Sequence, residues 1–249
     1  MRGASDCLAP SKEVLAFMTL SPAAAKTKMP IFDAHSVAGG LASSFRDAVR
    51  SEQPYRHWML SEVFGGAVVE ALSSLDFPAP DLGGVSGARE LHNDTRQYFD
   101  QANIAGRPVC RAIAEAFQAP ETVAMISAAT GAALGGCYLR IEYAQDIDGF
   151  WLQPHTDLGV KKLTMLYYLA DSEGQDDLGT DIYRDAYTWA KRSAFAPDSA
   201  LVFVPSSNTW HGFAPRPIPG VRKSVIINYV TNEWRAREQL AYPAEPVGA

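Results

Sequence analysis

The sequence is poor in cysteine, in clustered basic residues and in long apolar runs. Its three cysteines, Cys7, Cys110 and Cys137, are odd in number and far apart, which argues against a disulfide framework and favours reduced thiols in a cytoplasmic protein. Lys and Arg number 22 against 28 Asp and Glu, for a formal net charge of −6, so nucleic acid and anionic membranes are poor candidates for partners. No apolar run is long enough to span a bilayer.

What is present suggests one globular domain behind a short arm. The 249 residues are 47% hydrophobic and 20% charged, which is ordinary for a protein with a sizeable core. Residues 1–28 are rich in Ala, Ser, Lys and Pro, and we expect a weakly ordered N-terminal arm there. Residues 29–249 are expected to form a single domain, and the oligomeric state is left open.

The first part of this domain, about 29–133, has the apolar spacing of helices. Apolar residues recur at three- and four-residue steps within 39–75. Two further helices are predicted near 106–118 and 120–132, each with a proline in its first turn.

The second part, about 134–232, has the texture of β-structure. It contains four β-branched and aromatic runs, "CYLRIEYA", "KLTMLYYLA", "ALVFVP" and "KSVIINYV". The acidic segment 171–181 between them is expected to be a solvated turn. Short strands at this spacing predict a mainly β protein with N-terminal helices, in which the helices buttress a jelly-roll or another double-sheet barrel.

A possible metal site begins at "QPHTDLG", where His155 and Asp157 lie two residues apart. Such side chains on an extended chain point to the same side and can converge on one ion. His211, several strands later, would supply a third ligand. Two imidazoles and one carboxylate are the ligand set of non-haem Fe(II) oxygenases, which leave coordination positions open. A structural zinc site would instead be closed by four protein ligands.

A possible anion receptor lies further along, on the last predicted strand. Arg222 and Ser224 share one face of that strand, and a guanidinium with a hydroxyl forms a good receptor for a carboxylate. An unpaired buried guanidinium is costly, so a bound carboxylate is expected to be its partner. The far carboxylate of 2-oxoglutarate would fit this position while its other end chelates the iron.

The ordered set His155, Asp157, His211, Arg222 and Ser224 resembles the Fe(II)/2-oxoglutarate-dependent dioxygenases, in particular their bacterial prolyl-4-hydroxylase-like branch. The resemblance covers about residues 134–232. It implies a double-stranded β-helix fold, Fe(II), 2-oxoglutarate and O₂, and hydroxylation of an unactivated C–H of a small molecule or peptidyl residue, with release of succinate and CO₂. The usual Gly-Gly-Glu-Leu run is replaced by "DDLGTDIYR", which leaves the substrate side of the site undefined.

Four further residues have two interpretations each. Tyr143 is either a second contact to 2-oxoglutarate, as the strand tyrosine is in similar enzymes, or a core aromatic. Arg140 would meet an acidic substrate or a structural carboxylate. Trp151 and Trp210 flank the metal motifs and would line a substrate cavity or simply pack in the core.

Two other functions stay open at this point. One is a jelly-roll sensor that binds metal and 2-oxoglutarate without turnover. The other is a metal-dependent hydrolase, in which a metal-bound water attacks an ester or amide. The presence of the co-substrate pair Arg222 and Ser224 argues against both functions. In a hydrolase, these two residues would have no role.

Overall fold

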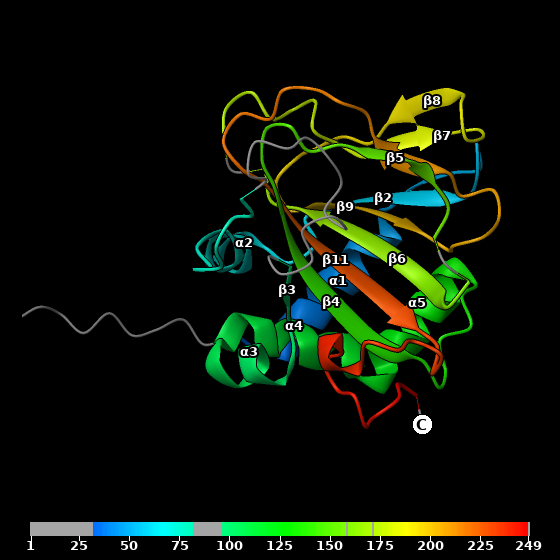
Figure 1. The fold of residues 1–249 in the computed structure, drawn as a ribbon. Coiled ribbons are helices and arrows are strands. Elements are labelled where there is room, and N and C mark those ends of the chain that lie inside the picture. Colours follow the sequence, from blue (N-terminus) through cyan, green and yellow to red (C-terminus); the bar gives the residue numbers. More distant parts are fainter. Residues whose placement is uncertain (1–31, 82–95, 158, 171, 249) are drawn as a thin grey trace, which may run out of the picture. The chain divides into compact units, whose positions relative to one another are not determined.

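The computed structural model describes residues 32–81, 96–157, 159–170 and 172–248, so the predicted arm at 1–28 lies outside the described residues. These described residues form one compact unit. Within it, a layer of helices covers one face of a large antiparallel sheet, and a smaller antiparallel sheet lies over the other face (Figure 1). The expected mainly β fold with helices toward the N-terminus is therefore confirmed.

The helical layer is built from short segments. Their bounds are α1 (Ala34–Arg46), α2 (Gly66–Ser73), α3 (Gln101–Gly106), α4 (Pro108–Gln118) and α5 (Pro120–Thr130). Helices α4 and α5 both begin at a proline, as predicted. Proline suits this position because the amide hydrogens of the first helical turn have no partner within the helix. Helix α5 ends at Thr130, and its C-cap residue Gly131 has a φ of 79°, a conformation that favours glycine. No helix among the described residues is long and apolar enough to cross a membrane.

The large sheet has seven strands in the order β1-β2-β9-β6-β11-β4-β3. Their bounds are β1 (Val49–Ser51), β2 (His57–Ser61), β9 (Ser199–Phe203), β6 (Lys161–Tyr168), β11 (Arg222–Val230), β4 (Tyr138–Asp146) and β3 (Gln97–Tyr98). Four of these, β4, β6, β9 and β11, are the predicted apolar runs, and they form the middle of the sheet.

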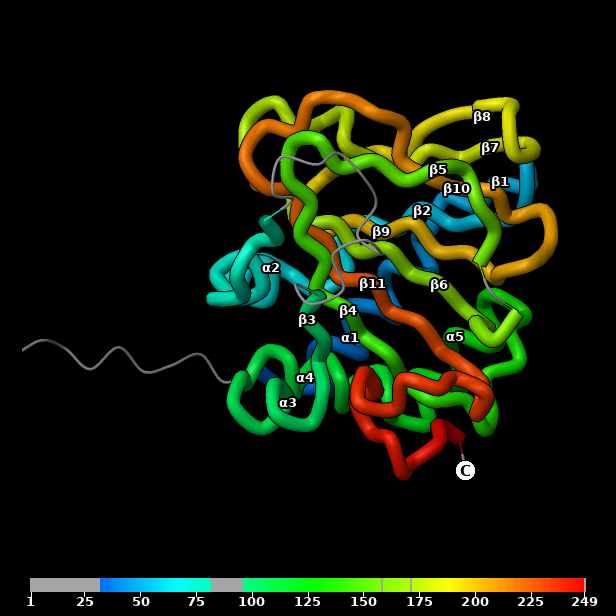
Figure 2. Tube along the Cα trace, viewed as in Figure 1, coloured from blue at the N-terminus to red at the C-terminus, as the bar shows by residue number. Residues whose placement is uncertain are grey.

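The small sheet has four short strands in the order β5-β10-β7-β8. Their bounds are β5 (Leu152–His155), β10 (His211–Phe213), β7 (Asp181–Tyr183) and β8 (Trp189–Arg192). Strands β5 and β10 lie side by side although more than fifty residues separate them (Figure 2). This neighbourhood positions the site described below.

Strand alternation divides the apolar side chains between two cores. On β11, Val225 and Ile227 belong to the core beneath the helices, whereas Ile226 belongs to the core between the sheets. Cys110 and Cys137 are free and buried in the helix-facing core, whereas Cys7 lies outside the described residues.

The prediction of helical structure from about 39 to 75 is wrong in part. Strands β1 and β2 occupy Val49–Ser51 and His57–Ser61 and extend the large sheet. In β2 the side chains of Trp58 and Leu60 are both buried. The short apolar run "HWMLS" is compatible with a helix or with a strand. Pairing with β9, which is distant in sequence, selects the strand.

The acidic segment 171–181 is also not a wholly solvated turn. Asp181, its last residue, is fully buried in β7 and accepts hydrogen bonds from Arg192 Nε (2.7 Å), Arg216 Nη1 (2.6 Å) and the Ala214 amide (2.8 Å). Burial raises the pKa of this carboxyl, but these hydrogen bonds outweigh it, so the pKa is lowered. Through these hydrogen bonds, Asp181 on β7 links this strand to β8 and to the segment that follows β10.

Candidate metal centre and adjoining cavity

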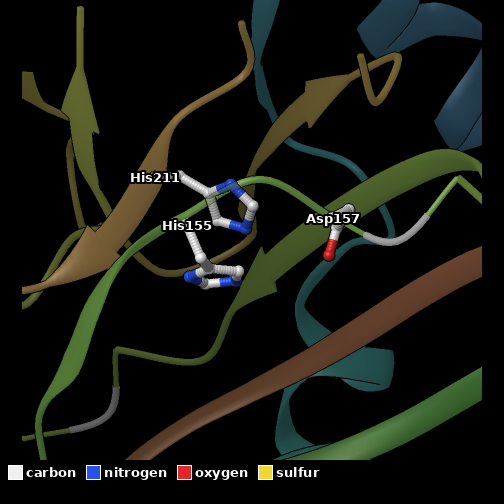
Figure 3. Close-up of side chains that lie close together, drawn as sticks. All are labelled: His155, Asp157 and His211. Atoms are coloured by element: carbon white, nitrogen blue, oxygen red, sulfur yellow. The ribbon is translucent and has the colours of Figure 1, made fainter. Parts of the chain in front are cut away.

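His155 and His211 face each other across the paired strands β5 and β10 (Figure 3). They are directly opposed in the strand register, and their ring centroids lie 4.4 Å apart. The next residue, Gly212, permits this close pairing, because a Cβ there would lie 2.7 Å from the Leu152 carbonyl oxygen. The backbone therefore sets the separation of the two imidazoles.

Hydrogen bonds to backbone fix which nitrogen each imidazole presents. His155 Nδ1 lies 3.0 Å from the Gln153 carbonyl oxygen, and His211 Nδ1 lies 3.0 Å from that of Thr209. A carbonyl oxygen only accepts, so each Nδ1 carries the hydrogen and each Nε2 keeps a lone pair for a metal. Burial lowers the pKa of His211 to about 4, so this ring is neutral at physiological pH, as a ligand must be.

Asp157 completes the set from the loop that follows β5. Its carboxylate accepts hydrogen bonds from Lys161 Nζ (2.5 Å) and Thr164 Oγ1 (2.6 Å), and its side chain is 4% exposed. Burial alone raises the pKa of Asp157, but the charge of Lys161, aided by His211 and both hydrogen bonds, outweighs it and lowers the pKa to about 2. The carboxylate is therefore ionised.

The donor set fits a divalent metal. One ligand atom from each of His155, Asp157 and His211 lies within 4.8 Å of the others, and among the described residues this is the group of His, Cys, Asp and Glu side chains that could hold an ion. Two imidazoles and one carboxylate on one side suit Fe(II) with open positions. The three predicted ligands are thus brought together from two strands and a loop.

The triad opens onto a cavity of about 350 Å³ between the two sheets. Arg222 and Ser224 on β11 line the same cavity. Both are buried, and their shared strand face agrees with the predicted period of two. The structure therefore brings the expected anion receptor and the expected metal ligands to one cavity.

Arg222 differs from expectation in one respect, because it has a protein partner. Its Nη1 donates to Asp146 Oδ2 at 2.6 Å and its Nε to the Leu178 carbonyl oxygen at 2.7 Å. Asp146 lies directly opposite Arg222 in the register of β4 and β11. The premise that the guanidinium lacks a partner is wrong. Its Nη2 has no hydrogen-bond partner among the described residues, so part of the fork stays available to a ligand.

Tyr143 lies on the other side of β4, away from the cavity. Its hydroxyl donates to the Leu72 carbonyl oxygen at 2.9 Å, and its ring packs against Phe77 in the helix-facing core. Arg140 and Glu142 point to the opposite face of β4 from Tyr143, and they line the cavity instead. Of the two interpretations of Tyr143, the structure supports the core aromatic.

Trp151 and Trp210 are half-buried and are not among the residues that line the cavity. Each is the sequence neighbour of a residue that does line it, Leu152 and His211. Successive side chains on extended chain point to opposite faces, which explains why these two tryptophans miss the cavity. Trp234, which the sequence did not indicate, lines it instead.

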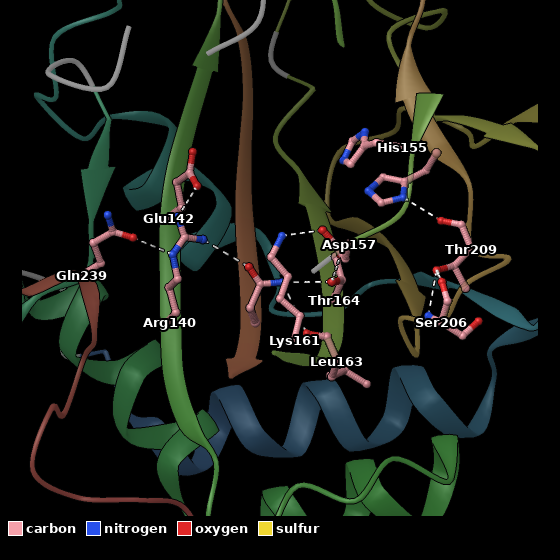
Figure 4. A network of polar contacts seen from close by, with 12 residues as sticks. Arg140, Glu142, His155, Asp157, Lys161, Leu163, Thr164, Ser206, Thr209 and Gln239 are labelled. Atoms are coloured by element: carbon pink, nitrogen blue, oxygen red, sulfur yellow. Dashed lines mark hydrogen bonds and ion pairs between the residues drawn. The ribbon is translucent and has the colours of Figure 1, made fainter. Parts of the chain in front are cut away.

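Arg140 lines the cavity as part of a polar network (Figure 4). It donates to Gln239 Oε1 (3.0 Å), Asn228 Oδ1 (3.2 Å) and Glu142 Oε2 (2.8 Å). Its guanidinium also lies 4.9 Å from the ring centroids of Tyr98 and of Trp234. These contacts favour a structural carboxylate, Glu142, as the partner of Arg140.

We expect Arg140→Met to lower the free energy of unfolding by about 3 kcal/mol, because it breaks a buried ion pair. The effect lies at the lower end of the usual range, since Glu142 retains Arg96. Urea denaturation measures it. Arg111→Met, at an exposed position on α4, is the matched control and should change stability by less than about 0.5 kcal/mol. A similar small change for Arg140→Met would contradict the structural assignment.

Sequence reasoning did not single out three residues that support the site. Thr164 and Lys161 hold Asp157, and Asp146 holds Arg222. The alternation of "KLTMLYYL" places Thr164 on one face with Leu166, but no sequence signal says that Asp157 meets that face. The pairing of Asp146 with Arg222 follows from the strand register, which is set by the fold.

No protein-family model matches the chain, and no curated protein matches it by sequence. Solved structures do match. A prolyl 4-hydroxylase of Phytophthora capsici is 14% identical, with 85% of this chain and 70% of that chain covered and a TM-score of 0.52. A Pseudomonas putida prolyl-4-hydroxylase is 14% identical, with 79% and 93% covered and a TM-score of 0.51.

The fold is that of the prolyl 4-hydroxylases. This confirms, at the level of the fold, the resemblance stated from the ordered motif residues. The shared prolyl 4-hydroxylase fold extends over more of the chain than the segment 134–232 that carries the motifs, since up to 85% of the chain is covered.

Proposed function

We propose that the protein is an Fe(II)- and 2-oxoglutarate-dependent oxygenase that hydroxylates an unactivated C–H of a small molecule or peptidyl residue. The observation that carries the proposal is the convergence of His155, Asp157 and His211 on a cavity that Arg222 and Ser224 also line. In this proposal, the seven-stranded and four-stranded sheets would form the jelly-roll, or double-stranded β-helix, core of such an enzyme.

His155, Asp157 and His211 would hold the iron from one side and leave its other positions to ligands. Bound there, Fe(II) with 2-oxoglutarate and O₂ supplies the oxidising chemistry, with succinate and CO₂ as co-products. The chain prepares the ligands in advance. Asp157 is ionised and His211 neutral at physiological pH, so neither has to lose a proton when the metal arrives.

Arg222 and Ser224 would bind the far carboxylate of 2-oxoglutarate. Asp146 and the Leu178 carbonyl oxygen fix the guanidinium in place, so little side-chain freedom is lost when a ligand binds. The remaining Nη2 hydrogens and the Ser224 hydroxyl are the donors for the carboxylate. A buried position strengthens these contacts, because water does not compete for them.

The walls of the cavity carry both apolar side chains and polar groups. Phe150, Phe213 and Leu166 supply apolar surface, whereas Arg140, Glu142 and Asn228 supply the polar network. We assign the network to the substrate side, where it defines the shape of the pocket. A preorganised site of this kind would orient a substrate C–H toward the metal and limit side reactions.

The function is tested by anaerobic addition of Fe(II) and 2-oxoglutarate, followed by O₂. We expect a weak visible charge-transfer band before O₂ and succinate afterwards, with one succinate per 2-oxoglutarate consumed. Zn(II) in place of Fe(II) is the control and should give neither signal. The band without succinate, over a panel of amino acids, peptides and small metabolites, would contradict the proposal and favour a sensor. Iron bound one to one with neither band nor succinate would contradict it and favour a hydrolase.

A further inference from the structure

The carboxylate of Asp157, a candidate metal ligand, already forms an ion pair with a lysine of the chain, Lys161. Lys161 Nζ lies 2.5 Å from Oδ1, and Thr164 Oγ1 lies 2.6 Å from Oδ2, so both oxygens already have protein donors (Figure 4). Thr164 is fixed in turn by Asn228 Nδ2 at 3.0 Å. A divalent ion therefore meets a ligand whose charge is already compensated.

A β-bulge delivers Lys161 to this position. In the ladder between β6 and β11, Leu163 lies opposite Tyr229, whereas Val230 lies opposite Lys161, so Lys162 is an extra residue. Without the bulge, Lys161 would share the face of Leu163, which is buried in the helix-facing core. The extra residue reverses the alternation, and Lys161 lines the cavity on the same face as Thr164. Bulges that redirect a side chain are common beside active sites.

Lys161 and a metal ion would compete for the same carboxylate. The Lys161 side chain is 19% exposed, and among the described residues its ammonium bonds only to Asp157. An ammonium and a divalent cation that share one carboxylate repel each other, and the partly buried site screens this repulsion less than bulk water does. Thr164 carries no charge, so it can orient the carboxylate with the metal present. Lys161 cannot do so without an electrostatic cost.

We propose that Lys161 is a positioning residue that occupies Asp157 in the metal-free protein and lowers the affinity of the site for divalent metal. Metal loading is then an exchange of an ammonium for the ion, and it releases the Lys161 ammonium into the cavity. The inference rests on the metal site of the proposed function, but it concerns affinity and not turnover.

The test uses Mn(II), titrated into the metal-depleted full chain and followed by the EPR signal of the unbound ion. Lys161→Met is expected to bind Mn(II) at least about tenfold more tightly than the wild type, or about 1.4 kcal/mol. Lys161→Arg keeps the charge and should stay close to the wild type. Lys162→Met removes the adjacent exposed lysine and is the matched control, with no change expected.

Thermal unfolding gives a second readout. Metal-free Lys161→Met should melt below the wild type, because buried Asp157 loses its charged partner and keeps only Thr164. Saturating Mn(II) should raise the Tm of this variant by more than it raises that of the wild type. If Lys161→Met fails to fold, Lys161→Gln removes the charge while keeping a donor, and the same outcome is expected. Equal or weaker Mn(II) binding by the neutral variants, with one-to-one binding by the wild type, would overturn the proposal and leave the metal site intact. Absence of stoichiometric binding by the wild type would overturn the metal site itself.

Discussion

Replacement of His155 by alanine will abolish stoichiometric binding of Fe(II). The two imidazoles are directly opposed on paired strands, and Asp157 reaches them from the adjoining loop. With one imidazole gone, His211 and Asp157 offer two ligand atoms, and Lys161 stays on the carboxylate. We therefore expect the affinity to fall beyond the range of a titration at micromolar protein, measured anaerobically.

The fold should survive this change, because His155 is only half-buried and its ring donates to a neighbouring backbone carbonyl. Far-ultraviolet circular dichroism and an unchanged Tm of the metal-free protein would show this. His35→Ala, at an exposed position on α1, removes a histidine elsewhere and should bind iron normally. One-to-one binding of unchanged affinity by His155→Ala would refute the assignment of the ligand.

The Arg222→Ala protein is expected to bind 2-oxoglutarate about ten- to a hundredfold more weakly, since a charge-assisted contact contributes about 1.5–3 kcal/mol. Iron affinity should change little, because Arg222 is not a metal ligand. Arg222→Lys should recover only part of the loss, since lysine keeps the charge but lacks the planar fork. The titration follows the charge-transfer band of the iron complex.

Loss of Arg222 also leaves Asp146 buried beside a cavity, so Arg222→Ala is expected to be less stable as well. The titration is therefore done well below the Tm of the variant, with Arg184→Ala, at an exposed position, as the control. An unchanged dissociation constant for 2-oxoglutarate would place the anchor elsewhere. Arg140, the other buried arginine on the cavity wall, would then be the next residue to replace.

The sequence predicted the site better than its surroundings, and the reason is physical. Residue type limits metal ligands strongly, so His155, Asp157 and His211 could be selected from few candidates. The central strands β4, β6, β9 and β11 were also predictable, because β-branched and aromatic residues are concentrated in them. Both features are encoded locally and need no knowledge of tertiary contacts.

Features that depend on pairing between distant strands could not be predicted. Strand β2 is short, and its pairing with β9 decides its structure. A tyrosine such as Tyr143 could contact a co-substrate, but the alternation of side chains along β4 points it toward the helices. Asp146 becomes the partner of Arg222 only through the register of β4 and β11. The bulge at Lys162 reverses strand alternation, which a regular pattern cannot anticipate.

The division of the β-structure into two sheets has a consequence for how a ligand affects stability. His155 and His211 belong to the small sheet, and Arg222 belongs to the large one. A molecule held at both ends touches both sheets at once. Its binding free energy is therefore added to whatever holds the sheets together, and any fluctuation that separates them has to release the ligand first. A co-substrate bound as proposed would therefore act as a cross-link between two layers of the protein.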